Sequence, residues 1–189
     1  MTGNDYRDRI AAYVHDNFHK HGLEVYTEVG LGKTIIGKRR KLDVFIRQRD
    51  EPLALGLECK YQATSGTTDE KVPYALADLE AMWIPGCLVY AGAGWSSGVL
   101  HTLEGSRNAV FCDPPERGLR DPAKTVELDY VLASVFGLWE IVIPEGRRFE
   151  SERQLTLPGA GLRRVTEAPR PRVKPRKAGV GAKVRSSSG

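Results

Sequence analysis

The chain has 189 residues, of which 41% are hydrophobic and 28% charged, the proportions of a soluble globular protein with room for one well-buried domain. No apolar run approaches the ~18 residues of a membrane span, and the N-terminus lacks the basic and apolar regions of a signal peptide, so we expect no membrane association. The three cysteines, Cys59, Cys87 and Cys112, have neither CxxC nor zinc-binding spacing. We therefore expect buried free thiols in a reducing cytoplasm.

The net charge of +4 is distributed unevenly along the chain. Residues 163–189 contain nine Lys or Arg and one acid, whereas residues 1–162 contain 19 basic and 23 acidic residues. The basic end is rich in proline and poor in apolar residues, a composition typical of disorder. We therefore divide the chain into a folded domain, 1–162, and a disordered basic tail, 163–189. Such a tail suits a polyanion such as DNA, and a merely solubilising role is the alternative.

Apolar residues at helical spacing predict an amphipathic helix over residues 5–21, which ends at Gly22. A strand over 23–29 follows, then a glycine-punctuated turn over 30–38. Two further strands, 41–46 and 53–60, form a hairpin around residues 49–52.

The second half of the domain alternates helices and strands. The apolar positions that mark the next helix are Val72, Leu76, Leu79 and Trp83, with Thr67 to Glu70 near its start. The elements that follow are a strand over 87–91, a helix over 96–104, a strand over 109–112 and a helix from an N-cap at Asp121 to Gly137. This order predicts an α/β domain with a mixed central β-sheet flanked by helices.

Charged residues gather at the end of the predicted central hairpin. Side chains alternate along a strand, so Glu58 and Lys60 project from one face, and Cys59 joins Leu53, Leu55 and Leu57 on the opposite apolar face. Asp43 lies on the preceding strand. Two carboxylates and an ammonium in an otherwise apolar setting are costly unless they bind something, and a divalent metal with a water nucleophile satisfies all three.

This pattern, an Asp followed on the next strand by Glu-x-Lys, resembles the PD-(D/E)XK nuclease superfamily, whose fold is the restriction-endonuclease-like core. The resemblance implies that Asp43 and Glu58 bind the metal, together with the backbone carbonyl of Cys59. It also implies that Lys60 orients or activates the attacking water. Mg²⁺ is the expected ion, with Mn²⁺ as a substitute. Leu42 stands where the family pattern has Pro.

Four further residues are candidate nucleic-acid contacts. Gln62 continues the alternation of Glu58 and Lys60, and Lys71 lies in a segment similar to one that follows Glu-x-Lys in restriction-type members. Arg39 and Arg40 belong to a basic segment that either approaches a DNA backbone or forms a plain solvated turn. For Lys71, an ordinary exposed lysine at the start of a helix is an equal alternative.

These observations lead to the hypothesis of a metal-dependent DNA endonuclease that hydrolyses phosphodiester bonds. A restriction-type enzyme and a Holliday-junction resolvase, which would act as a homodimer, both fit the sequence. The alternatives are a DNA-binding module of the same fold that does not cut, within a larger assembly, and an α/β domain whose Glu-x-Lys is only a surface ion pair.

Overall fold

The computed structural model describes residues 1–66, 68–116 and 118–143. The predicted domain boundary after residue 162, the basic tail 163–189 and Thr67 lie outside the described residues. The helices and strands are, in chain order, α1 (Gly3–Phe18), η1 (His19–His21), β1 (Leu23–Lys33), β2 (Arg39–Gln48), β3 (Ala54–Tyr61), η2 (Asp69–Lys71), α2 (Val72–Glu80), β4 (Gly86–Ala91), α3 (Ser97–Glu104), β5 (Ala109–Phe111), α4 (Pro122–Phe136) and η3 (Trp139–Ile141). None of the helices in these described ranges is long and apolar enough to cross a membrane.

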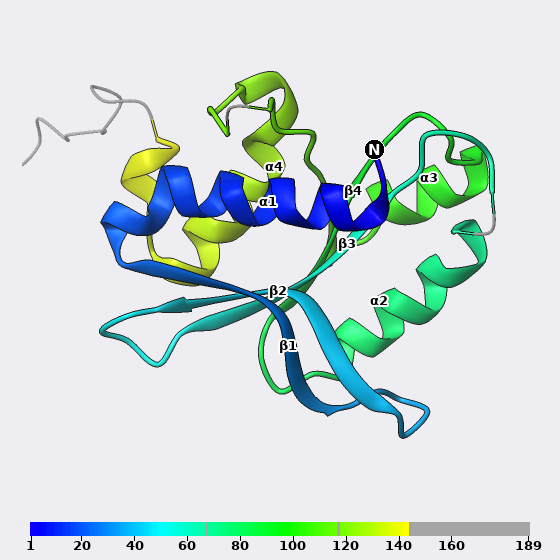
Figure 1. The fold of residues 1–189 in the computed structure, drawn as a ribbon, viewed down its shortest axis with the longest axis horizontal. Helices are drawn as coiled ribbons and strands as arrows, with labels where there is room; N and C mark the ends of the chain where they lie inside the picture. The colour runs from blue at the N-terminus through cyan, green and yellow to red at the C-terminus, as the bar shows by residue number, and fades with distance from the viewer. Residues whose placement is uncertain (67, 117, 144–189) are drawn as a thin grey trace, which may run out of the picture. The chain divides into compact units, whose positions relative to one another are not determined.

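The five strands form one sheet in the order β1-β2-β3-β4-β5 (Figure 1). β1, β2 and β3 are antiparallel neighbours, whereas β3–β4 and β4–β5 are parallel. The parallel pairs are joined through α2 and α3, since a parallel connection needs a crossover. The predicted mixed α/β sheet flanked by helices is therefore confirmed.

Each face of the sheet is covered by two helices. One core packs α1 and α4 against inward side chains such as Val44 and Leu57, and a second core packs α2 and α3 against Leu88 and Tyr90. α1 and α2 consequently lie on opposite sides of the strands (Figure 1). Alternation along β4 explains this, because Val89 faces the first core and its neighbours face the second.

The helix ends agree with the capping residues read from the sequence. The side chain of Asp121 accepts a hydrogen bond from the backbone N–H of Ala123 at 3.1 Å, and α4 begins at Pro122. Gly22 and Gly137 end η1 and α4 with positive φ of 87° and 70°, a conformation in which glycine avoids strain.

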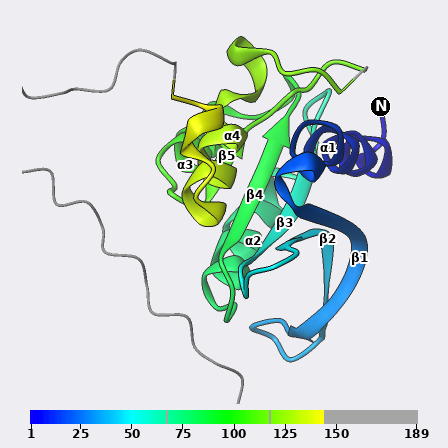
Figure 2. The same cartoon turned by 90° about the vertical axis from the view of Figure 1, so that its left-hand side faces the viewer.

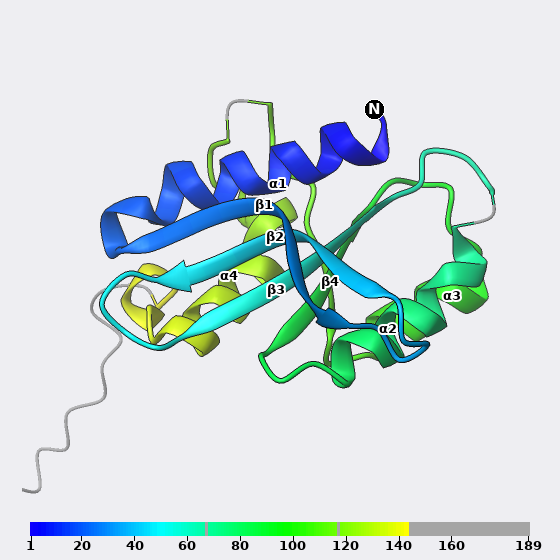
Figure 3. The same cartoon turned by 60° about the horizontal axis from the view of Figure 1, so that its bottom comes forward.

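The β1–β2 hairpin is longer than predicted. β1 extends to Lys33, into the residues expected to form the turn, and β2 begins at Arg39, so that only residues 34–38 connect the strands. The register of the pair shifts between Gly30 and Lys33. β1 curves strongly along its length (Figure 2), and the end of the hairpin comes to lie against α2 (Figure 3). A long hairpin rather than a flexible loop therefore carries the basic segment 38–41.

Two predicted apolar positions are exposed instead. Leu53 precedes β3 and is 37% exposed, whereas Leu55 and Leu57 are buried as expected. Trp83, expected on the apolar stripe of the second helix, is 99% exposed, because α2 ends at Glu80. The chain then turns toward Pro85, and Met82 rather than Trp83 packs against the second core.

Candidate functional site

Asp43 and Glu58 lie where β2 and β3 stop pairing. Val44 and Leu57 form the last pair at this end of the two strands. Asp43 immediately precedes Val44, and Glu58 immediately follows Leu57. The backbone N–H of Cys59 donates a hydrogen bond to Oδ2 of Asp43 at 2.8 Å. The carboxylate of Asp43 is thereby held beside the Glu-Cys-Lys segment of β3. Cys59 itself lies in the first core, on the opposite face from Glu58 and Lys60, as expected.

Glu58 is partly buried and forms an ion pair with the ammonium of Lys60. Burial raises the pKa of Glu58; the positive charge of Lys60 opposes this shift, and the negative charge of nearby Asp43 adds to it. The two carboxylates are therefore close enough to repel one another. A divalent cation bound beside these carboxylates would offset this repulsion.

The donor set at this point fits a hard divalent cation. Asp43 and Glu58 supply carboxylate oxygens and Cys59 a backbone carbonyl, which are the ligand types that Mg²⁺ accepts while keeping several waters. In the described part of the chain, no group of three or more His, Cys, Asp or Glu side chains could hold a metal ion. A binding site here would therefore depend on two carboxylates, with water or phosphate completing the coordination.

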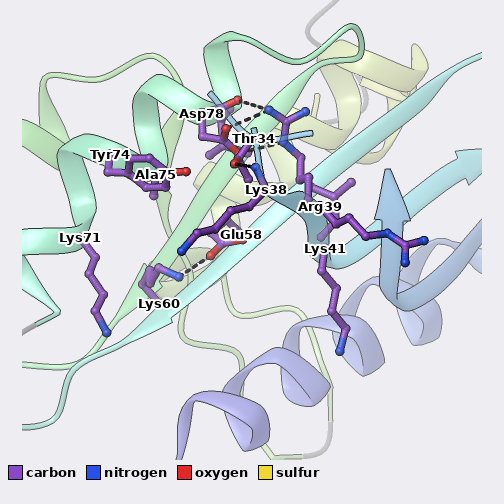
Figure 4. A pocket seen from close by; sticks show the side chains of 13 residues that line it. Thr34, Lys38, Arg39, Lys41, Glu58, Lys60, Lys71, Tyr74, Ala75 and Asp78 are labelled. Atoms are coloured by element: carbon purple, nitrogen blue, oxygen red, sulfur yellow. Dashed lines mark hydrogen bonds and ion pairs between the residues drawn. The ribbon is translucent and has the colours of Figure 1, made fainter. Parts of the chain in front are cut away.

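A pocket of about 380 Å³ opens beside Glu58 and Lys60, between the β1–β2 hairpin and α2 (Figure 4). Two acids, Glu58 and Asp78, line it together with six cations, which are Lys38, Arg39, Arg40, Lys41, Lys60 and Lys71. The lining thus carries an excess of positive charge, which favours an anionic ligand.

Three of these cations are already paired. Lys41 binds Glu28 at 2.8 Å, Lys60 binds Glu58, and Arg40 binds Asp78.

The other three cations are Lys38, Arg39 and Lys71, which have no carboxylate partner within 4.0 Å among the described residues. In Figure 4, Lys71 extends on one side of Glu58 and Arg39 on the other. Unpaired cations on both sides of an acidic centre can hold successive phosphates of a nucleic-acid backbone.

Arg40 is not a free surface cation. Its side chain is buried, and its Nε and Nη2 donate to the two carboxylate oxygens of Asp78 at 2.8 and 2.9 Å. Asp78 also accepts a hydrogen bond from the backbone N–H of Ile35 at 2.7 Å. The hydrogen bonds from Arg40 lower the pKa of Asp78, against the effect of burial. This arrangement attaches the hairpin to α2, so the guanidinium of Arg40 is engaged by Asp78, whereas Lys38 and Arg39 line the pocket.

Gln62 is also withdrawn from the pocket. Its amide nitrogen donates to Asp69 at 2.7 Å and to the backbone carbonyl of Gly94 at 2.8 Å, and its amide oxygen is buried without a hydrogen-bond partner among the described residues. The side chain therefore connects the segment after β3 to the loop after β4.

The loop after β4 requires glycine at two positions. A Cβ on Gly92 would lie 2.1 Å from the backbone oxygen of Gln62, and one on Gly94 would lie 2.4 Å from the backbone carbon of Thr64. Close backbone packing thus holds residues 62–64 against the loop after β4.

Sequence reasoning missed Asp78 as a member of this site, and it placed Lys38 and Lys41 only within the basic segment 38–41. A signal for Asp78 is present, since an acid between the buried Ala75 and Leu79 falls on the apolar stripe of its helix. An acid in that position has to be paired when it is buried. Its partner, Arg40, lies 38 residues earlier, and no pattern in the sequence connects the two.

One known protein family matches the chain over most of its length. A family model described as a PD-(D/E)XK nuclease superfamily domain matches residues 2–139. The comparison with curated proteins found no match. A crystal structure of a protein of unknown function, AF1548, aligns at 14% identity with a TM-score of 0.36, covering 52% of this chain and 54% of that chain.

Proposed function

This chain belongs to the PD-(D/E)XK nuclease superfamily, and from that premise we propose that it is a metal-dependent DNA endonuclease. Membership implies a nuclease-type fold and a nucleic-acid substrate, and nucleases of this superfamily generally use divalent metal ions. The observation that carries the proposal is the meeting of Asp43, Glu58 and Lys60 beside a pocket with an excess of cations. A domain that only binds a polyanion has no physical need for two adjacent carboxylates.

In the proposed reaction, Asp43, Glu58 and the backbone carbonyl of Cys59 would hold Mg²⁺, for which Mn²⁺ could substitute. When bound, the ion supplies Lewis acidity to a phosphate oxygen and lowers the pKa of a water. Lys60 orients the attacking water and stabilises the charge that develops on the phosphate. Attack of the water on phosphorus breaks the P–O3′ bond, which leaves a 3′-hydroxyl and the 5′-phosphate that the family resemblance implies.

The unpaired cations position the substrate. Lys71 at the start of α2 and Arg39 on β2 hold phosphates on either side of the scissile bond, and Lys38 adds a third contact. Gln62 contributes by fixing the segment between Lys60 and Lys71 and not by contacting phosphate.

The proposal extends to the rest of the chain and to its surroundings. Residues 163–189 form a separate basic tail, following a domain of residues 1–162, and add sequence-independent affinity for DNA. The three cysteines are free and buried, which favours a reducing compartment, and we place the enzyme in the cytoplasm. A homodimer is expected if the enzyme is of the resolvase type.

The test is to incubate the protein with supercoiled, linear, branched and single-stranded DNA, with Mg²⁺, with Mn²⁺ and with EDTA. Cleavage should require the metal and should be abolished in Asp43→Ala and Glu58→Ala, while both variants still bind DNA in Ca²⁺. Asp50→Ala is the matched control, because it removes an exposed acid from the turn at the other end of the β2–β3 hairpin. Cleavage in EDTA, or full activity in Asp43→Ala, would contradict the site assignment.

The competing function is a DNA-binding module that does not cut. The pairing of Glu58 with Lys60, and of Asp43 with the backbone of Cys59, favours it, because both carboxylates already have partners. The same assay separates the two functions: a non-cutting module binds DNA with either metal and leaves every substrate intact.

A further inference from the structure

The most exposed aromatic side chain in the described ranges is Trp83, just after α2, with 99% of its surface in contact with solvent. Ile35 and Ile36, in the turn of the β1–β2 hairpin, are 49% and 60% exposed. A groove of about 420 Å³ separates the hairpin from the segment after α2, and Leu31, Met82 and Ile84 line it together with Trp83. A solvent-open groove that is lined by half-buried apolar side chains beside a fully exposed tryptophan marks an interaction site.

This groove is continuous with the proposed nuclease site. Arg40 lines both the groove and the basic pocket, so the hairpin forms a wall of each. Lys33 adds a cation to the groove. α2 runs from Lys71 of the basic pocket toward Trp83, and its nine residues span about 13 Å at 1.5 Å per residue. That length corresponds to about three to four nucleotides at 3.4 Å each.

A second copy of the chain is a poor fit to this surface. A fully exposed aromatic side chain offers about 150–250 Å². The half-exposed Ile35 and Ile36 add less than this, so the total stays well below the roughly 800 Å² per partner of a stable protein interface. One flat aromatic ring beside a cation, on the same wall as a phosphate-binding pocket, instead matches the chemistry of a nucleobase and its phosphate.

We propose that Trp83 stacks on an unpaired base of the DNA substrate, about three to four nucleotides from the phosphate that Lys71 holds at the other end of α2. The inference rests on the proposed function and specifies its substrate: DNA with an unstacked base, as in a bulge, a gap or a branch. In a continuous duplex the faces of the bases are covered by their neighbours, so an indole can reach one only where stacking is interrupted. Trp95 is not available for this role, because it is buried and its Nε1 donates to the carbonyl of Ala91 at 3.1 Å.

The experiment measures binding by fluorescence anisotropy in Ca²⁺, which needs no cleavage. The probes are a continuous duplex and a series of the same duplex with one unpaired base moved along it. The wild type should prefer the best-placed unpaired base, and Trp83→Ala should lose about 5- to 150-fold in affinity for that probe, the factor expected for stacking on one base. Affinity for the continuous duplex should not change. Trp83→Phe should retain most of the preference, and Trp139→Phe, which alters another exposed tryptophan, should behave as wild type.

The outcomes separate this inference from the function on which it rests. If the wild type cuts DNA and the Trp83→Ala variant keeps the same preference for the unpaired base, the inference about Trp83 is wrong and the proposed nuclease function stands. A Trp83→Ala variant that turns a dimer into a monomer and leaves the preference intact assigns the surface to a second copy and overturns it as well. A wild type that binds none of the probes refutes the proposed function. Because Trp83 is exposed, its replacement should leave the unfolding midpoint in urea unchanged, and this measurement verifies that the variant is folded.

Discussion

Replacing Asp78 by alanine should destabilise the protein by about 3–5 kcal/mol, because it leaves the guanidinium of Arg40 buried without its carboxylate. The two residues are only 9% and 8% exposed, so water cannot readily replace the missing partner. The substitution also removes the acceptor of the Ile35 backbone N–H.

The effect should depend on pH in a defined direction. Arg40 lowers the pKa of Asp78 in the folded protein below the unfolded value of about 3.9. The stabilisation is then fully present at pH values above the unfolded-state pKa of Asp78, and it is lost as the pH falls through the folded-state pKa. The difference in unfolding free energy between wild type and Asp78→Ala should be constant from about pH 5 to 8 and should shrink below about pH 4.

Urea denaturation of Asp78→Ala, Arg40→Met and the double variant Arg40→Met/Asp78→Leu tests this reasoning. The double variant replaces the pair by apolar side chains and should recover much of the stability that either single variant loses. It should still bind DNA more weakly than wild type if the pair positions Lys38 and Arg39. Losses below about 1 kcal/mol in both single variants would refute the assignment of a buried, coupled pair.

Three further predictions concern the catalytic group, the glycine loop and the tail. Lys60→Ala should lower the single-turnover cleavage rate by about 10²–10³, the usual effect of removing one charge-stabilising group, and an unchanged rate would exclude Lys60 from catalysis. Gly94→Ala should lower stability in urea by about 1–3 kcal/mol, because its Cβ would overlap the Thr64 backbone, whereas Gly98→Ala, with open space around it in α3, should be neutral or slightly stabilising. A chain that ends at Leu162 should bind DNA more weakly at low salt. Its slope of log K against log[salt] should be flatter by ~0.9 for each phosphate that the tail neutralises in the full chain. Equal slopes for the two chains would show that the tail takes no part in binding.

The sequence by itself determined the α/β class, the order of the elements and the pairing of the two strands that carry the acidic residues. These features follow from local patterns: the alternation along β3 buries Leu57 and Cys59 and leaves Glu58 on the other face. Caps such as Asp121 are equally local, since a side chain and a backbone N–H two residues later are sufficient to start a helix. The roles of Asp43, Glu58 and Lys60 remain predictions from the family resemblance.

Only the tertiary structure decided which charged residues of the described ranges line the pocket without a carboxylate partner and which are paired. Arg39 and Arg40 are adjacent and alike in sequence, yet Arg40 is buried against Asp78 and Arg39 lines the pocket without a carboxylate partner among the described residues. Gln62 continued the alternation of β3 but was drawn into contacts with Asp69 and Gly94. Pairings between residues tens of positions apart depend on how the β1–β2 hairpin bends over α2. The local spacing of apolar residues in the sequence does not predict that bend. The exposure of Trp83 was decided in the same way, because the helix that the apolar spacing predicted to include it ends three residues earlier.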